Sequence, residues 1–192
     1  GAGGWDKKSL IGLGVFEETL GIMGFGRIGT QVAQRALAFG MKVLAFDPHI
    51  NAARAQEMSV TVADMETILK TADAITLHLP LTTETRGIID ASHISKTKKG
   101  LRLINCARGE LIDIDALLAA LDSGQISYAG LDVFPTEPLP ADHPLRAHPR
   151  AVLTPHLGAS THEAQARVGI EIAESVSEFL LTGKARNTVS LP

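Results

Sequence analysis

Short apolar runs alternate along the chain with stretches whose apolar residues recur at helical spacing. Runs of the first kind predict buried strands, and stretches of the second kind predict amphipathic helices. The predicted strands span residues 19–25, 41–47, 59–62, 74–80, 101–107, 127–134 and 151–156. The predicted helices span residues 28–39, 51–58, 65–71, 114–123 and a final stretch that ends near residue 181.

Polar residues and glycines mark the ends of these helices. Asp64 and Asp113 each precede an apolar stretch and are predicted to be N-caps. Gly40 and Gly124 follow helical stretches and are predicted to end them. The last helix is predicted to begin at Ser160 or Thr161, because Ser160 and Glu163 have capping-box spacing. The proline-rich segment 135–149 is predicted to be loop.

Strands that alternate with helices predict an α/β fold, a mostly parallel and doubly wound sheet with helices on both faces. In such a sheet, ligands bind beyond the carboxyl ends of the strands, near the point where the strand order reverses. The residues directly after each predicted strand are therefore the first candidates for a functional site.

Composition narrows the class of protein. The chain has 192 residues, of which 45% are hydrophobic and 20% charged, so a packed core is expected. A formal charge of −3 gives no reason to expect a nucleic acid or an anionic membrane as partner. No apolar run is long enough for a membrane helix, and the first residues lack a signal-peptide pattern. One cysteine fits a reducing compartment, so a cytoplasmic location is expected, with an organelle left open.

The sequence GFGRIG follows the first predicted strand and opens the first predicted helix. Gly24 permits a tight turn, Gly26 lets a pyrophosphate approach the backbone, and Gly29 lets the helix pack close to the strand. The helix N-terminus then offers free N–H groups to the phosphates. This context favours the dinucleotide-binding fingerprint of Rossmann-type folds over a turn that binds nothing.

The second predicted strand ends at Asp47, near the spacing at which the fingerprint places an acidic residue. A carboxylate there accepts hydrogen bonds from both ribose hydroxyls and repels a 2′-phosphate, which favours NAD over NADP. The alternative is a turn acid before Pro48. Arg54 lies close enough in sequence to keep some use of NADP open.

Polar residues follow three of the later strands. Arg108 is suited to pair with a substrate carboxylate, and His156 is suited to accept the proton of a hydroxyl group. Glu137 would stabilise the imidazolium, and Asp132 could accept a hydrogen bond from the nicotinamide carboxamide. Each residue taken alone has a structural explanation, but together they fit hydride transfer between nicotinamide and a 2-hydroxy acid.

Two other chemistries were weighed against this one. Cys106 lies in an apolar run without a neighbouring histidine, so a buried, inert thiol is expected rather than a nucleophile. His143 with His148, and His156 with His162, do not make a convincing ligand set, so no metal is expected. His78 is expected to line the cofactor cleft or to pack.

Six motifs occur in an order that resembles one enzyme family. They are GFGRIG, FDP, HLPL, NCARGE, LDVFPTEP and PHLGAST, and they resemble the D-2-hydroxyacid dehydrogenases, with the strongest resemblance to the phosphoglycerate dehydrogenases among them. The resemblance runs from about Trp5 to Asn187. It implies NAD as cofactor, a Rossmann-type nucleotide-binding domain and a small 2-hydroxy acid as substrate. In the phosphoglycerate dehydrogenases this substrate is phosphorylated.

The resemblance also implies roles for individual residues. Arg108, Glu137 and His156 match the catalytic arginine, glutamate and histidine of the family. Leu79 stands where a threonine is common, so Leu79 and Pro80 are expected to contact the cofactor through their backbone only. The other implied cofactor contacts are Gly24, Gly26, Arg27, Ile28, Gly29, Asp47, Cys106, Ala107, Arg108, Asp132, His156, Gly158 and Ala159.

The length of the chain implies a domain rather than a whole enzyme. Residues 1–192 are expected to form one NAD-binding domain, with 1–18 as an entry segment and 19–187 as the core and final helix. A separate substrate-binding domain and a homodimer or higher homo-oligomer are expected in the parent protein. Glyoxylate or hydroxypyruvate as substrate, or an NAD-sensing module like the corepressors that share these motifs, remain alternatives.

Overall fold

The computed structural model describes residues 11–186 and 188, and the chain forms two compact units, Gly1–Pro155 and His156–Pro192. Most of the entry segment 1–18, Trp5 included, and Asn187 lie outside the described residues. The two units are described separately below, and the division into an entry segment and a core stays a prediction.

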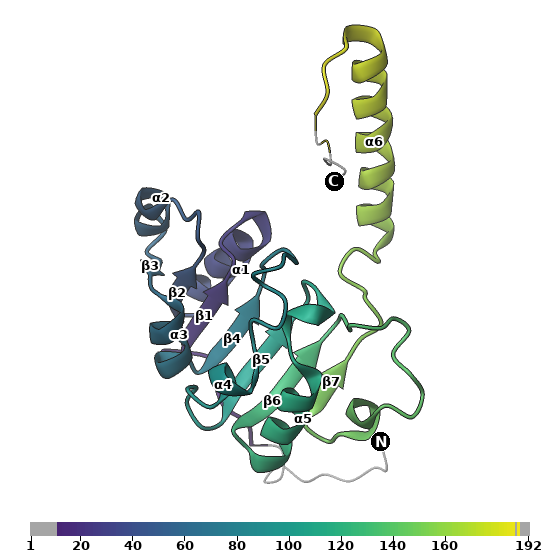
Figure 1. Cartoon of the computed structure of the whole chain (residues 1–192). Coiled ribbons are helices and arrows are strands. Elements are labelled where there is room, and N and C mark those ends of the chain that lie inside the picture. The colour runs from purple at the N-terminus through teal and green to yellow at the C-terminus, as the bar shows by residue number, and fades with distance from the viewer. Residues whose placement is uncertain (1–10, 187, 189–192) are drawn as a thin grey trace. The chain divides into compact units, whose positions relative to one another are not determined.

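The first unit alternates strands with helices (Figure 1). Its elements are β1 (Thr19–Met23), α1 (Arg27–Ala38), β2 (Lys42–Phe46), α2 (Ala52–Glu57), β3 (Thr61–Val62), α3 (Met65–Thr71), β4 (Ala74–Leu77), α4 (Ala91–Ile94), β5 (Leu101–Asn105), the 3₁₀ helix η1 (Gly109–Leu111), α5 (Ile114–Ser123), β6 (Ile126–Leu131), the 3₁₀ helix η2 (Pro144–Ala147) and β7 (Ala151–Leu153). The second unit contains α6 (His162–Thr182).

The strands form one seven-stranded sheet in the order β3-β2-β1-β4-β5-β6-β7, and every neighbouring pair is parallel. The chain moves outward from β1 to β3 and then returns to place β4 on the other side of β1. The order therefore reverses between β1 and β4, which is where such sheets bind ligands. The predicted doubly wound, Rossmann-type fold is confirmed.

The two faces of the sheet carry separate hydrophobic clusters, because successive strand side chains point to opposite faces. On one face, Leu20 and Ile22 of β1 pack with Ala33 and Ala36 of α1. On the other face, α3, α4 and α5 cover the sheet, and their buried residues include Ile68, Leu69, Ile94, Leu117 and Leu121.

The helix caps follow the sequence in the first unit. Asp64 and Asp113 accept hydrogen bonds from backbone N–H groups in the first turns of α3 and α5, as predicted. Gly124 ends α5 with φ 75°, a conformation that glycine adopts without strain. Asp90 caps the four-residue α4, which the sequence pattern did not indicate because so short a helix shows no periodicity.

The sequence left Ser160 and Thr161 as alternatives for the start of the last helix, and Thr161 is confirmed, because its hydroxyl accepts the hydrogen bond from Ala164 N that caps α6. Other predicted boundaries were wrong. The strands end two to three residues early at β4, β5, β6 and β7, because the apolar runs continue past the last paired residues. The segment 135–149, predicted to be loop, contains the 3₁₀ helix η2. Pro144 is the first residue of η2, where proline is tolerated because the N–H group that it lacks would have no partner within the helix.

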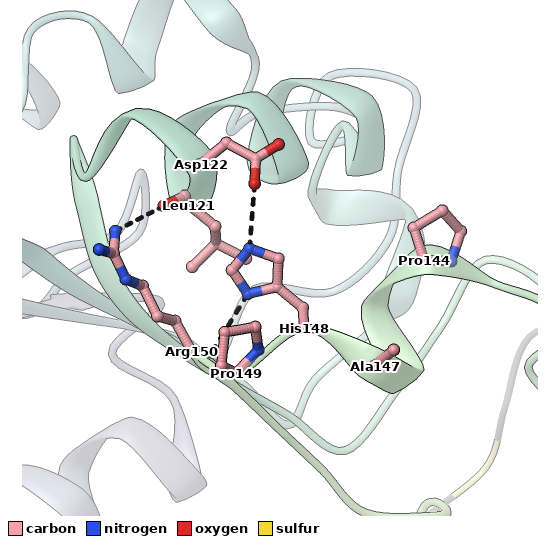
Figure 2. Close-up of a pocket in the computed structure, with 7 residues that line it drawn as sticks. All are labelled: Leu121, Asp122, Pro144, Ala147, His148, Pro149 and Arg150. Carbon is pink, nitrogen blue, oxygen red and sulfur yellow. Dashed lines mark hydrogen bonds and ion pairs between the residues drawn. The ribbon is translucent and has the colours of Figure 1, made fainter.

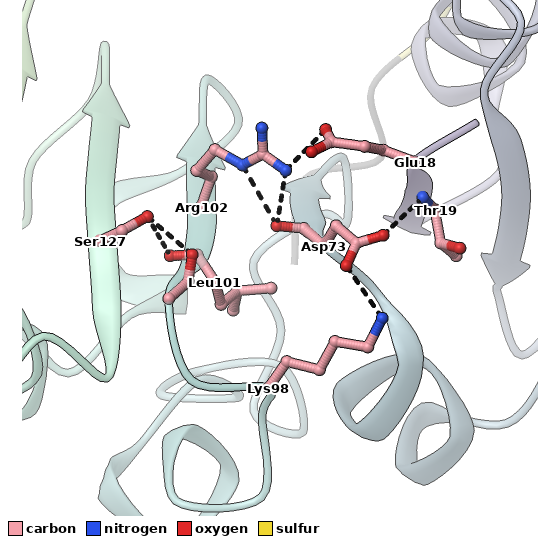
Figure 3. A network of polar contacts seen from close by, with 8 residues as sticks. Glu18, Thr19, Asp73, Lys98, Leu101, Arg102 and Ser127 are labelled. Atoms are coloured by element: carbon pink, nitrogen blue, oxygen red, sulfur yellow. Dashed lines mark hydrogen bonds and ion pairs between the residues drawn. The ribbon is translucent and has the colours of Figure 1, made fainter. Parts of the chain in front are cut away.

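A polar network joins the amino ends of β1, β4 and β5 (Figure 3). Asp73 Oδ2 accepts a hydrogen bond from Thr19 N at 2.8 Å, and Asp73 Oδ1 pairs with Lys98 Nζ at 2.9 Å. Arg102 Nη2 pairs with Glu18 Oε2 at 2.6 Å and also donates to the carbonyl of Asp73. Burial acts to raise the pKa of Asp73, but the hydrogen bonds from Thr19 and Lys98 outweigh it, so this pKa is lowered.

We expect Asp73→Ala to lower the free energy of unfolding by about 1–3 kcal/mol, because Thr19 N loses its acceptor. Since the folded pKa of Asp73 is lowered, its charge stabilises the fold above the unfolded pKa, and this contribution disappears as pH falls through the folded value. Urea unfolding at pH 7 and pH 3 measures both effects. Lys70→Ala, in an exposed ion pair, is the control and should lower the free energy of unfolding far less. An equal loss in both variants would contradict the assignment.

Candidate functional site

The glycine turn connects β1 to α1 at the point where the strand order reverses. Gly24 has φ +99°, and a Cβ there would lie 2.5 Å from the backbone carbonyl of His78, after β4. A Cβ on Gly29 would lie 2.0 Å from the carbonyl oxygen of Gly24. Both positions therefore require glycine for packing within this chain.

Gly26 differs from its two neighbours in the motif. Its φ is −76°, which any residue adopts, and a Cβ there would meet nothing within 4 Å. Gly26 directly precedes α1, whose first turn has no acidic residue and no side-chain cap. The turn thus leaves open space in front of a helix N-terminus, which suits an anionic group.

Asp47 lies just after β2 and is held by backbone amides. Its Oδ2 accepts from Phe25 N at 2.8 Å, within the glycine turn, and its Oδ1 accepts from His49 N at 2.8 Å. The structure therefore brings the carboxylate and the glycine turn together, as the fingerprint spacing predicts. The carboxylate is also fixed in position, because each oxygen has one backbone donor.

The segment after β4 lies against the glycine turn. His78 N donates to Met23 O at 2.6 Å, and the imidazole Nε2 lies 3.1 Å from Thr76 Oγ1. Burial lowers the pKa of His78, which favours its neutral form. The side chain of Leu79 is buried in the core, whereas Pro80 is exposed, so Leu79 offers only its backbone to a ligand.

Asn105, the last residue of β5, shapes the next loop, and the sequence analysis missed it. Its side chain is 1% exposed; Nδ2 donates to Arg108 O and Oδ1 accepts from Ala107 N. Its own carbonyl accepts from Asp132 N, after β6. The buried side-chain amide therefore fixes the backbone of Ala107 and Arg108, and the main-chain carbonyl of Asn105 holds that of Asp132. An asparagine at a strand end before a polar loop was the available signal.

The loops that carry Arg108 and Glu137 contact each other through their backbones. A Cβ on Gly109 would lie 2.0 Å from the carbonyl carbon of Phe134, so the turn after Arg108 touches the loop that carries Glu137. Glu137 Oε1 accepts from Phe134 N at 2.9 Å, and Arg108 Nη1 donates to Ala107 O at 2.7 Å. Both residues are exposed at the carboxyl edge of the sheet.

Cys106 and Asp132 lie on neighbouring loops at the same edge. Asp132 is 6% exposed and accepts from the hydroxyl of Thr154 at 2.5 Å. Burial, and then the negative charge of Asp132, raise the pKa of the Cys106 thiol. Cys106 is exposed, so the expected burial was wrong. Its raised thiol pKa still disfavours the thiolate at neutral pH, which agrees with an inert thiol.

His156, Gly158 and Ala159 belong to the second unit. His156 has φ 55°, an uncommon conformation for a residue other than glycine, and it comes directly after the last residue of the first unit. With Ala159 and residues of the first two turns of α6, it lines a hollow of about 540 Å³. The structure thus places His156 in an open surface of its own unit.

His148 lines a hollow of about 360 Å³ near the end of α5 (Figure 2). His148 Nδ1 accepts from Arg150 N, and Nε2 lies 3.3 Å from Asp122 Oδ1. Arg150 in turn donates to Leu121 O at 2.8 Å. Both ring nitrogens of His148 therefore have partners that hold the loop on α5. In the described part of the chain, no group of three or more potential ligands is placed to hold a metal ion.

A family model described as "D-isomer specific 2-hydroxyacid dehydrogenase, NAD binding domain" matches residues 1–158.

The chain belongs to this family.

D-3-phosphoglycerate dehydrogenase of Bacillus subtilis is 48% identical over 188 residues, which cover 98% of this chain and 36% of that protein. A glyoxylate reductase structure from Paecilomyes thermophila matches with a TM-score of 0.88 at 34% identity, over 95% of this chain and 55% of that one. A D-lactate dehydrogenase structure with NAD⁺ from Lactobacillus jensenii matches with a TM-score of 0.83 at 36% identity, over 98% and 60%. The chain thus spans about a third of the length of the curated relatives.

The residues of the glycine turn fit the NAD that this family binds. The space in front of Gly26 is what a pyrophosphate needs, and Asp47 is fixed beside the turn, where the adenosine ribose would lie. No described helix combines the length and the apolar character that crossing a membrane demands.

The first prediction from this site concerns the two glycines that differ in their surroundings. We expect Gly26→Ala to unfold at the same temperature as the wild type within about 2 °C but to bind NADH about tenfold more weakly, because its Cβ enters only ligand space. Gly29→Ala should instead lose about 1–3 kcal/mol of stability through overpacking. Thermal unfolding and NADH titration measure both; unchanged NADH affinity in a folded Gly26→Ala would contradict the role of Gly26.

The second prediction concerns the single cysteine of the chain. The pKa of Cys106 is raised, so its alkylation by iodoacetamide should be slow at pH 7.5 and should rise steeply above pH 9. Asp132→Asn removes one of the two causes, and we expect about a two- to threefold faster reaction at pH 7.5. Asp113→Asn, which caps α5, is the charge control. Identical rates in all three proteins would show that Asp132 does not act on the thiol.

Proposed function

We propose that this chain is the nucleotide-binding domain of an NAD-dependent D-3-phosphoglycerate dehydrogenase. The protein that carries it would oxidise 3-phosphoglycerate to 3-phosphohydroxypyruvate, the entry step of serine biosynthesis. The observation that carries the choice of substrate is the 48% identity with D-3-phosphoglycerate dehydrogenase of Bacillus subtilis over 98% of this chain. We further propose a homodimer or larger homo-oligomer.

The proposed site residues divide the work between the cofactor and the substrate. The turn residues Gly24, Gly26, Arg27, Ile28 and Gly29 would hold the pyrophosphate at the N-terminus of α1. Asp47 would hold the adenosine ribose. The remaining contacts are proposed for Leu79, Pro80, Cys106, Ala107, Asp132, Gly158 and Ala159. When bound, NAD supplies the hydride acceptor.

Three residues are proposed to act on the substrate. Arg108 would hold the substrate carboxylate and polarise the carbonyl oxygen as it forms; its exposed position on a loop fixed by Asn105 supports this role. His156 would accept the hydroxyl proton. Glu137 would stabilise the imidazolium, and its anchoring to Phe134 N supports a positioned carboxylate.

A second candidate substrate is glyoxylate or hydroxypyruvate. The structural match to a glyoxylate reductase, with a TM-score of 0.88, favours it. The identity to that protein is 34%, against 48% for the phosphoglycerate dehydrogenase, so we place it second.

The experiment uses the longer protein that carries this chain. We expect NADH formation with 3-phosphoglycerate and a kcat/KM at least tenfold above that for the acids related to glyoxylate. His156→Gln should lower kcat by about 10²–10⁴ and leave the Kd for NADH within about threefold, because the proton acceptor is lost while the cofactor contacts remain. Turnover that survives this change would remove His156 from the mechanism. Comparable turnover of glyoxylate would favour the second candidate.

A further inference from the structure

Asp132 is a buried carboxylate at the carboxyl edge of the sheet. It comes directly after β6, and it is 6% exposed. Its backbone is held by the hydrogen bond from Asp132 N to Asn105 O at 3.0 Å. The backbone does not orient the carboxylate, because the terminal torsion of an aspartate side chain is broad and roughly two-fold. A fixed orientation of this carboxylate therefore requires a hydrogen bond from a side chain.

Thr154 supplies this hydrogen bond from the neighbouring strand. Leu131 of β6 pairs with Leu153 of β7, and Thr154 N donates to Leu131 O at 3.0 Å, so the parallel ladder continues one residue past β7. Asp132 and Thr154 are the next residues on the two strands, and the hydroxyl of Thr154 donates to Asp132 Oδ1 at 2.5 Å. Because threonine is restricted at χ1, its hydroxyl stays directed at the carboxylate.

The hydrogen bond joins an exposed donor to a buried acceptor. Thr154 is exposed, whereas Asp132 is buried. An ionised carboxylate has about four lone-pair sites, so the bond from Thr154 leaves Asp132 able to accept from the amide group of a ligand. Since Thr154 lies outside the core, its hydroxyl can be replaced by a methyl group without overpacking the interior. The orientation of the carboxylate and the stability of the fold can thus be tested separately.

We propose that Thr154 is a positioning residue for the nicotinamide half of NAD, because its hydroxyl holds the Asp132 carboxylate in the orientation that accepts from the carboxamide N–H group. The inference rests on the proposed function, in which Asp132 contacts this half of the cofactor. Thr154 itself would not touch the cofactor. A carboxylate held in one orientation limits rotation of the nicotinamide ring, and with it the position of the carbon that accepts the hydride.

The test compares NADH with ADP-ribose, which lacks the nicotinamide ring, in titrations of the longer protein that carries this chain. We expect Thr154→Val to weaken NADH by about three- to tenfold and ADP-ribose by less than about twofold, because only the nicotinamide half loses an oriented acceptor. Thr154→Ser should restore most of the NADH affinity, since it keeps a hydroxyl donor. Thr71→Val is the matched control: it removes an exposed hydroxyl that donates to Thr67 O in α3, and it should change neither affinity.

A double-mutant cycle tests whether Thr154 acts through Asp132. Asp132→Asn should weaken NADH more than ADP-ribose, because the charged acceptor is lost. On the Asp132→Asn background, Thr154→Val should weaken NADH by less than about a further twofold, since there is no longer a carboxylate to orient.

Several results would overturn the proposal. Equal weakening of NADH and ADP-ribose by Thr154→Val would indicate a general effect on structure, and unchanged NADH affinity would remove Thr154 from the site. Effects of the two substitutions that multiply independently would show that Thr154 does not act through Asp132. Wild-type protein that binds NADH no more tightly than ADP-ribose would refute the contact at Asp132 and leave the pyrophosphate site standing. No binding of either ligand by the folded protein would refute the cofactor site, and with it both the proposed function and this inference.

Discussion

The contact between the glycine turn and the segment after β4 is the constraint on which the site depends. Gly24 lies so close to the carbonyl group of His78 that no side chain fits between them, and His78 N donates to Met23 O. Gly24 N donates to Phe46 O, so the ends of β2, β1 and β4 are tied at one point. Because the strand order reverses there, this contact sets both the start of α1 and the position of Asp47.

The loops after β5 and β6 are also fixed by close backbone contacts and hydrogen bonds, made there by other residues. The side-chain amide of Asn105 fixes the loop that follows it, and the main-chain carbonyl of Asn105 ties this loop to Asp132, after β6. Gly109 then lets two loops touch, as Gly24 does on the other side. The loops after β5 and β6 are thus fixed by Asn105 and Gly109, which are not among the proposed ligand contacts. This explains how exposed side chains such as Arg108 stand on a defined backbone.

The sequence predicted the features that depend on local chemistry. The three glycines, Asp47 and the caps Asp64 and Asp113 were identified because sequence spacing alone indicates a glycine turn, the acidic residue beside it and the N-cap of a helix. Asn105 was missed although the partners of its amide, Ala107 and Arg108, are local, because the sequence does not show that this side chain is buried. The predicted strands were too long because buried apolar residues continue past the last residue that pairs with a neighbouring strand. Leu79, for example, is buried in the core but follows the end of β4. The role of His156 stays a prediction, because φ and burial within its own unit do not report on a substrate.

The polar network at the amino ends of β1, β4 and β5 lies at the edge of the sheet opposite the glycine turn. Its members share no hydrogen bond with the proposed cofactor residues. Substitutions in this network can therefore change the stability of the domain without changing how it binds its ligand. This separation would benefit the family, whose relatives are named for phosphoglycerate, glyoxylate and lactate. Substitutions that change the substrate at the carboxyl ends of the strands need not lower the stability that the network at the amino ends provides.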